Sequence, residues 1–344
     1  MKKEELLASA NYTRYIPGKN GHYESFFVRA NHPHKPLAFW IRYTIFQPKG
    51  KPENAIGELW AIIFNGENDK HTALKVEYPI SRCSFSKDDF NIVIGDAVLT
   101  PGALQGTITY NGQKIQWDLT FTGNEDPVFL FPPKLYTTKL PKAKSLVGLP
   151  NALFNGTINV NGATMTIDNW VGSQNHNWGS KHTDYYAWGQ VCGFDNEPDA
   201  FLELATARIK IGPLWTPFMT PIVLRYKGTE YALNTLGESF GRARFGYFYW
   251  DFNAKKSGIS IEGSIFALSK DFVCLPYYNP PGGIKHCLNT KIASCQLKCK
   301  IKNEEFILQT QNRCAFEILT DDSGHGLEPL TQITVIATRS TVNR

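Results

Sequence analysis

The sequence predicts an all-β protein made of many short antiparallel strands. Three observations predict this fold class: several runs rich in β-branched and aromatic residues, repeated Asn-Gly pairs that favour tight turns, and little helical periodicity. Many short strands separated by turns are typical of β-sandwiches and β-barrels. A chain of 344 residues is long enough for two domains of ordinary size.

The expected elements follow the chain in order. Residues 1–10 are expected to form a short helix, and the strand-like run 39–46 ends at the turn 47–50. A second run, 58–64, ends at Asn65-Gly66. This pair predicts tight hairpin turns, because both residues must take a positive φ, and it recurs at Asn111-Gly112, Asn155-Gly156 and Asn161-Gly162. Later strands are expected at 200–210, 222–226, 245–253, 258–267 and 331–338.

Two stretches of the chain resemble each other. Residues 106–112 and 156–162 share a Gly-Thr-Ile start and an Asn-Gly end, and each is followed by an aspartate, Asp118 or Asp168. We interpret the likeness as shared hairpin chemistry, although an architecture of related β units also accounts for it.

The proline-rich passage 131–150 has the composition of a linker. We therefore expect a domain boundary within 150–175. This divides the chain into an N-terminal domain of residues 1–165 and a C-terminal domain of residues 166–344.

Charge and cysteine usage exclude several classes of protein. The net charge is +5, lysines are spread along the chain, and no nucleic-acid motif occurs, so nucleic-acid binding is not expected. Seven cysteines, without a pair of CxxC units, indicate reduced thiols rather than a disulfide framework or a structural zinc site.

Targeting and cofactor signals are also missing from the sequence. The charged N-terminus lacks the apolar core of a signal peptide, and no run approaches about eighteen apolar residues. We therefore expect a cytoplasmic protein without an integral membrane segment. Because neither GxGxxG nor a Walker loop occurs, no cofactor is expected. The oligomeric state is not indicated.

The most informative segments are 174–179 and 185–190, which mix aromatic rings, an imidazole and carboxamides. A buried imidazole or carboxamide costs free energy unless it is hydrogen-bonded. A ligand pocket, by contrast, combines apolar walls with a few placed polar groups. The sequence therefore predicts a pocket with these ligand-binding residues: Asn175, Asn177, Trp178, Tyr186, Trp188 and Gln190.

These segments carry a family resemblance. Asn177-Trp178-Gly179, followed by Trp188-Gly189-Gln190, resembles the lipocalin-like family of tocopherol cyclases and carotenoid hydratases (hydroxyneurosporene synthase type). His176 with Trp178 is similar to the hydratase branch, and residues 277–289 resemble an uncharacterised bacterial branch. The order of segments 26–29, 40–43 and 58–61 is also similar. The resemblance implies two tandem lipocalin-like antiparallel β-barrels, with a hydrophobic cavity between or within them.

The resemblance also implies a chemistry: an acid protonates a carbon–carbon double bond, and water or an internal hydroxyl traps the cation. The family is expected to carry this acid on the strand after the aromatic one, where this chain has Glu203. Burial raises the pKa of a carboxyl, so that it keeps its proton near neutrality. In a strand, Glu203 shares a face with Phe201 and Ala205. The alternative is a surface glutamate on a half-exposed strand.

The other candidates have structural alternatives too. Trp178, Tyr186 and Trp188 offer aromatic faces to a cation, or they are ordinary core residues. His176 orients water, relays a proton or hydrogen-bonds the acid, or it is a structural histidine that ties a bend. Asn175 and Asn177 line the pocket or cap turns.

No metal site is expected. His32 and His34 have no carboxylate or thiol nearby in the sequence. His286 and Cys287 are adjacent, and adjacent residues of a strand point to opposite faces, so they are not expected to form a catalytic pair.

Three functions remain open from the sequence. The first is cofactor-independent acid–base conversion (hydration, cyclisation or isomerisation) of an isoprenoid- or polyene-like molecule. The second is non-catalytic binding or carriage of a lipid or other hydrophobic metabolite. Carbohydrate binding on an open β-sandwich face is a third. An enzyme should hold Glu203 or another acid within hydrogen-bond reach of His176 in an enclosed cavity, whereas a carrier should have a purely apolar lumen with the polar motif tied up structurally.

Overall fold

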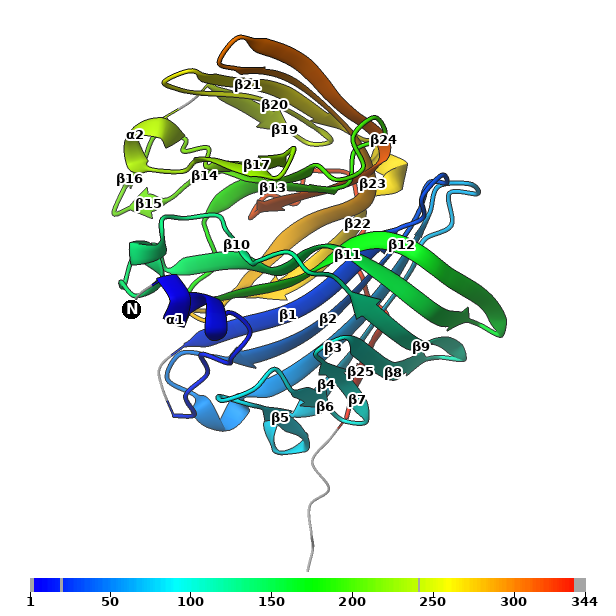
Figure 1. Cartoon of the computed structure of the whole chain (residues 1–344). Helices are drawn as coiled ribbons and strands as arrows, with labels where there is room; N and C mark the ends of the chain where they lie inside the picture. Colours follow the sequence, from blue (N-terminus) through cyan, green and yellow to red (C-terminus); the bar gives the residue numbers. More distant parts are fainter. Residues whose placement is uncertain (1–2, 19–20, 241, 337–344) are drawn as a thin grey trace, which may run out of the picture.

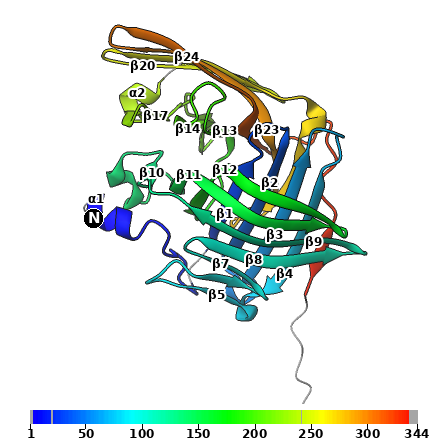
Figure 2. The ribbon, with the colours of Figure 1, turned by 45° about the vertical axis from the view of Figure 1, so that its right-hand side comes forward.

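The computed structural model describes residues 3–18, 21–240 and 242–336, and it confirms the all-β fold class. The chain forms two tandem lipocalin-like antiparallel β-barrels, each built from one curled sheet (Figure 1). Both views place the second barrel above the first, with β13 and β23 facing β1, β2 and β12 (Figures 1 and 2).

The first sheet contains 13 strands, and its order along the sheet is β25-β4-β3-β2-β1-β12-β11-β9-β8-β7-β6-β5, with β10 paired to β11. The bounds of these strands are β1 (His22–Asn31), β2 (Leu37–Gln47), β3 (Ile56–Asn65), β4 (Thr72–Pro79), β5 (Cys83–Phe85), β6 (Ile92–Ile94), β7 (Ala97–Thr100), β8 (Ala103–Tyr110), β9 (Gln113–Thr122), β10 (Val128–Phe129), β11 (Ala143–Val160), β12 (Ala163–Gly179) and β25 (Ile333–Val335).

The second sheet contains 10 strands in the order β18-β17-β14-β13-β24-β23-β21-β20-β19, with β22 paired to β23. Its strands are β13 (Tyr185–Cys192), β14 (Phe201–Arg208), β17 (Ile222–Tyr226), β18 (Thr229–Leu233), β19 (Ala243–Gly246), β20 (Tyr249–Lys256), β21 (Ile259–Phe266), β22 (Val273–Tyr278), β23 (Ile284–Ile301) and β24 (Glu304–Thr320). The strands β15 (Lys210–Ile211) and β16 (Leu214–Trp215) form a separate hairpin.

Helices are short in the described part of the chain. They are α1 (Lys3–Ala8), α2 (Leu236–Ser239) and the 3-10 turns η1 (Pro52–Asn54), η2 (Ile80–Arg82), η3 (Pro133–Tyr136) and η4 (Ser269–Asp271). None of these helices has the length and apolar character needed to cross a membrane.

Each sheet curls so that a strand at one end contacts a strand in the opposite half of the sheet. In the first barrel, the Thr334 hydroxyl on β25 donates to the Thr109 carbonyl on β8 at 2.8 Å. In the second, Lys256 on β20 donates to the Ala232 carbonyl on β18 at 3.1 Å. Side chains that alternate inward along the strands fill the two barrels with separate apolar cores.

The Asn-Gly pairs do not all form turns. Asn111-Gly112 and Asn161-Gly162 have positive φ at both residues and connect neighbouring strands, as the sequence predicts. For Asn155-Gly156 the prediction is wrong, because this pair lies inside β11 at a register shift. There, φ is +129° at Gly156, and a Cβ atom would collide with the backbone carbonyl of Asp118.

Most other elements fall near their expected positions, but the prediction of one strand at 245–253 is wrong, because this run contains the turn between β19 and β20. The expected N-terminal helix is α1, and the proline-rich passage holds η3 and the start of β11. Of the strand expected at 331–338, residues 333–335 form β25, and residues 337–338 lie outside the described part. The first sheet extends through β12 to Gly179, beyond the expected boundary at residue 165, and the domain limits stay a prediction.

Candidate functional site

The two barrels meet through a shared layer of large side chains. The first barrel contributes Phe27, Trp40 and Trp60, and the second contributes Trp188 and Tyr277, all buried. We call this packed region, together with the polar groups beside it, the inter-barrel layer. It is where side chains from distant parts of the chain meet.

The strand β12 divides the amide-rich motif between two places, because successive side chains point to opposite faces. His176 stacks on Phe26 at 4.2 Å between ring centroids, and Phe26 belongs to the core of the first barrel. Asn175, one residue earlier, contacts Ser173 and Gln190 in the inter-barrel layer. The segment that the sequence treats as one pocket therefore serves two sites.

Glu203 lies on β14 in the inter-barrel layer and is fully buried. Its neighbours Leu202 and Leu204 point the other way, into the core of the second barrel. The indole nitrogen of Trp188 donates to Oε1 of Glu203 at 2.8 Å, and the amide of Gln190 donates to Oε2 at 3.0 Å. Burial raises the pKa of Glu203 to about 8, although both hydrogen bonds and the charge of Arg29 act in the opposite direction.

Gln190 links Glu203 to the first barrel. Its carbonyl oxygen accepts hydrogen bonds from Arg29 at 2.9 Å and from Ser173 at 2.7 Å, and its amide nitrogen donates to Asn175 at 2.7 Å. Donors on one side and acceptors on the other fix the orientation of this carboxamide. Gln190 therefore presents an N–H group, and not its oxygen, to Glu203.

A second buried polar group lies in the same layer. Lys291 on β23 donates to Glu317 on β24 at 2.8 Å, and both are less than a tenth exposed. The ammonium group lies 5.5 Å from the ring of Trp40 and 5.4 Å from that of Trp188. Burial lowers the pKa of Lys291, against the influence of Glu317.

His176 does not contact Glu203. Its Nδ1 lies 2.6 Å from the carbonyl oxygen of Ala10, and its Nε2 lies 2.7 Å from Glu24. Burial alone would raise the pKa of Glu24, but hydrogen bonds with His176 and His22 outweigh it and lower the pKa to about 2. Both ring nitrogens of His176 are therefore engaged, one by a carbonyl oxygen and the other by a carboxylate.

These contacts hold the N-terminal segment against β1 and β12. The Thr13 hydroxyl donates to Glu24 at 2.8 Å, and the backbone N–H of Arg14 donates to it at 2.7 Å. Leu6 and Ala10 pack there with Trp178, whose ring lies 5.3 Å from the guanidinium of Arg14. Trp178 therefore lies with His176 and not with Glu203.

The remaining predicted residues divide in the same way. Tyr186 and Trp188 both pack in the inter-barrel layer, where Trp188 meets Phe27 edge-on at 6.2 Å. Asn177 is half-buried, and its side-chain oxygen has no hydrogen-bond partner within the described residues.

Sequence reasoning missed four charged residues of these sites: Glu24, Arg29, Lys291 and Glu317. Each lies within a strand, and Arg29, Lys291 and Glu317 are flanked by apolar or β-branched residues; a charged side chain is almost never fully buried unless it is paired. That pattern was a usable signal. It does not name the partners, which are supplied by other strands.

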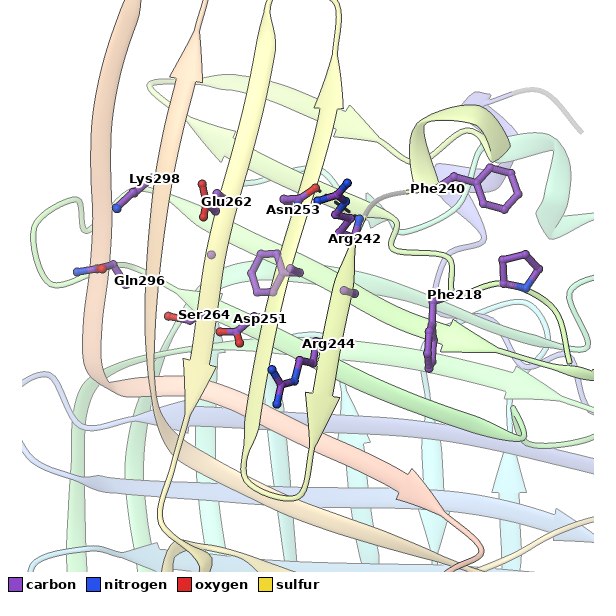
Figure 3. Close-up of a pocket in the computed structure, with 14 residues that line it drawn as sticks. Phe218, Phe240, Arg242, Arg244, Asp251, Asn253, Glu262, Ser264, Gln296 and Lys298 are labelled. Atoms are coloured by element: carbon purple, nitrogen blue, oxygen red, sulfur yellow. Dashed lines mark hydrogen bonds between the residues drawn. The ribbon is translucent and has the colours of Figure 1, made fainter.

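Two cavities lie outside this network. An open groove of about 640 Å³ runs over the outer face of β19, β20, β21 and β23, where Arg242, Arg244, Asp251 and Glu262 alternate with inward core residues (Figure 3). The second cavity, of about 10 Å³, lies in the inter-barrel layer beside Arg42, Tyr23, His182 and Tyr277. Neither of these two cavities is lined by Glu203 or His176.

Known proteins resemble this chain to different degrees. No family model matches it. An uncharacterised protein of Mycobacterium tuberculosis, recorded from two strains, is 22% identical over 191 residues, which is 56% of this chain. The match spans 57% of the length of these relatives.

Two crystal structures share the fold. A candidate AttH protein from Nitrosomonas europaea matches with a TM-score of 0.56 and 12% identity, over 90% of this chain and 98% of its own. Kievitone hydratase from Nectria haematococca matches with a TM-score of 0.55 and 11% identity, over 92% of each chain. At such low identity these likenesses show the fold alone. The fold implied by the family resemblance is confirmed: this chain has the two-barrel lipocalin-like architecture.

Proposed function

We propose that this protein carries out cofactor-independent acid–base conversion of a hydrophobic, isoprenoid- or polyene-like molecule in the inter-barrel layer, with Glu203 as the proton donor. One observation carries the proposal: Glu203 is a fully buried carboxyl with a pKa raised to about 8, held by two N–H donors among aromatic rings. Such a carboxyl keeps its proton at neutral pH and is poised to transfer it.

The chemistry follows from these neighbours. Glu203 transfers its proton to one carbon of a double bond, which leaves a cation on the other carbon. The π faces of Trp188 and Trp40 stabilise that cation. The N–H groups of Trp188 and Gln190 already point at the carboxylate that forms, so its charge is stabilised without rearrangement. Water or an internal hydroxyl adds to the cation, and the proton that it releases returns to Glu203.

Three residues position the acid in this scheme. Arg29, Ser173 and Asn175 hold the carboxamide of Gln190 in one orientation, so that its N–H faces Glu203. If the carboxamide of Gln190 were flipped, its oxygen would face Glu203, and its hydrogen bonds with Arg29, Ser173 and Asn175 would be lost. The solved hydratase of the same fold supports hydration as one form of the reaction.

A second candidate function is carriage of a hydrophobic metabolite without conversion. It is favoured by the contacts of His176, whose two nitrogens are both engaged by Ala10 and Glu24. Both nitrogens of that histidine are engaged, as the carrier hypothesis expects, although Glu24 is also an acid within hydrogen-bond reach of His176, as the enzyme hypothesis expects. His176 has no free nitrogen to relay a proton.

The experiment combines ligand identification with variants. Native mass spectrometry of the full chain purified from its own host identifies a bound apolar molecule, and conversion of that molecule is then followed by chromatography. Glu203→Gln is expected to abolish conversion while the molecule still binds. The matched control is Glu262→Gln, which changes an exposed glutamate of the outer groove and should leave conversion unchanged.

Three outcomes overturn the proposal. Full turnover by Glu203→Gln would show that Glu203 is not the proton donor. Loss of turnover only in Glu262→Gln moves the site to the outer groove. Binding without any conversion by the wild-type protein establishes the carrier function instead.

A further inference from the structure

Cys274, His286 and His325 form a compact cluster where the segment after β24 packs on β22 and β23. Their sulfur and nitrogen atoms all lie within 4.8 Å of one another. Nδ1 of His286 lies 2.6 Å from Nε2 of His325, and Sγ of Cys274 lies 3.8 Å from the same Nε2. Cys274 and His325 are almost completely buried, at 2% and 4% exposure.

The sheet register creates this cluster. In the antiparallel pair β22–β23, Cys274 lies opposite Leu288 and Pro276 lies opposite His286. Cys274 and His286 are therefore diagonal neighbours on one face of the sheet. The adjacent Cys287 points to the other face, into the inter-barrel layer. The thiol that accompanies His286 is thus Cys274, which adjacency in sequence does not reveal.

The third member comes from the segment after β24. The backbone N–H of Leu330 donates to the Cys274 carbonyl at 2.8 Å, which holds this segment against β22. The N–H of Leu327 donates to Nδ1 of His325 at 3.2 Å and orients the imidazole. Three separate elements therefore bring their ligand atoms to one point.

We propose that Cys274, His286 and His325 bind a zinc-type divalent metal ion. One thiolate and two imidazoles are a preferred donor set for Zn²⁺, which accepts three protein ligands and a water molecule in tetrahedral geometry. Nothing in the acid–base chemistry proposed for Glu203 uses these residues, so the two proposals are independent.

The structure also shows what must change on binding. Two nitrogens 2.6 Å apart share a hydrogen bond, whereas nitrogens on one tetrahedral zinc ion lie about 3.3 Å apart. The imidazoles therefore separate by less than about 1 Å. The proton on Nε2 of His325 moves to Nδ1, which breaks the long contact to Leu327. The thiol proton of Cys274 leaves to solvent as the metal–sulfur bond forms.

A bound metal ion would therefore link the segment 321–330 to the strands β22 and β23. This segment also carries Asp322, which accepts a hydrogen bond from the hydroxyl of Tyr247 at 2.5 Å. A metal that binds only the folded chain raises its thermal stability in proportion to the logarithm of metal concentration. Stability is therefore a readout that does not depend on any enzymatic activity.

The test uses the full chain after dialysis against a chelator. Zn²⁺ is titrated by calorimetry, Co²⁺ is followed by its thiolate charge-transfer absorption, and Tm is measured at rising Zn²⁺ concentration. The wild-type chain is expected to bind one equivalent, with a Co²⁺ band and a rising Tm. Cys274→Ala and His325→Gln should each weaken binding at least tenfold.

Matched controls make the result decisive. Cys299→Ala removes another buried thiol of the same barrel core, and His34→Gln removes an exposed histidine. Both should bind Zn²⁺ like the wild-type chain. Because His325 lies on a connecting segment, its variant tests the proposal even if Cys274→Ala does not fold. No stoichiometric binding by the wild-type chain, or equal binding by His325→Gln and His34→Gln, overturns the proposal.

Discussion

The protonation of Glu203 makes stability depend on pH in a way that one substitution isolates. In the unfolded chain the carboxyl has its ordinary pKa of 4.5, and burial raises the pKa in the folded protein to about 8. Below pH 4.5 both states are protonated. Between these values only the unfolded chain ionises, so the free energy of unfolding falls as the pH rises, and it levels off above about 8.

The size of this fall follows from the interval between the two pKa values. Each pH unit in which only one state is protonated corresponds to about 1.4 kcal/mol. The interval from 4.5 to about 8 in the pKa of Glu203 therefore gives a loss on the order of 5 kcal/mol. That is a large fraction of the stability of an ordinary domain.

Glu203→Gln removes the titration but keeps the shape. Its single amide oxygen accepts from Trp188 or from Gln190, not from both, so at low pH the variant should be about 1–3 kcal/mol less stable. The wild-type chain loses about 1.4 kcal/mol for each pH unit between 4.5 and about 8, so the variant should become the more stable protein between about pH 5 and about pH 7. The two stability curves are therefore expected to cross.

The assay is urea unfolding of both proteins between about pH 4.5 and about pH 9, followed by tryptophan fluorescence. Other titrating groups are common to both proteins, so the difference in unfolding free energy reports Glu203 alone. Glu262→Gln, at an exposed position, should show no crossing. A difference between wild type and Glu203→Gln that stays constant over this range refutes the neutral buried carboxyl.

Three further predictions concern the supporting structure. Glu24→Gln should be less stable than wild type near neutrality. The difference should shrink as the pH falls from 4.5 towards about 2, because the folded protein lowers the pKa of Glu24 from 4.5 to about 2 and this stabilisation is lost when the carboxylate is protonated. Acid unfolding measures this difference, and a pH-independent gap contradicts it. Arg29→Met should lose about 1–3 kcal/mol in urea, because it removes the buried guanidinium that donates to the side-chain and backbone oxygens of Gln190, whereas the exposed Arg82→Met should lose little. Equal losses of unfolding free energy in the two variants would show that the hydrogen bonds of Arg29 do not stabilise the fold. Gly172→Ala should lower Tm, because its Cβ meets the Arg29 carbonyl, whereas Gly237→Ala has open space and should not; similar Tm values refute that packing.

The strand pattern was predictable because it is local. Alternation of side chains places Tyr186, Trp188 and Gln190 on one face of β13. In the next strand, β14, it makes Glu203 and its neighbour Leu202 point to opposite faces of the sheet. Neither result depends on the rest of the chain. The structure has this arrangement. The turn prediction failed at Asn155-Gly156, where a shift in the register of β11 with β12 makes a bulge out of a pair that forms turns elsewhere.

The partners of the polar residues were not predictable in this way. His176 pairs with Glu24, which is 152 positions away, and Glu203 is linked through Gln190 to Arg29, which is 161 positions from Gln190. These pairs depend on the register between β1 and β12 and on how one curled sheet packs on the other. No spacing within a single strand encodes either of them.

The sequence by itself determined the all-β class, the alternation within strands and the presence of polar groups that require buried partners. Those properties follow from the geometry of each residue and its immediate neighbours. Only the tertiary structure decided that the amide-rich motif serves two sites, that His176 fastens the N-terminal segment, and that Glu203 lies between the barrels. The reason is physical: burial and charge pairing are properties of surfaces that meet only when distant strands pack together.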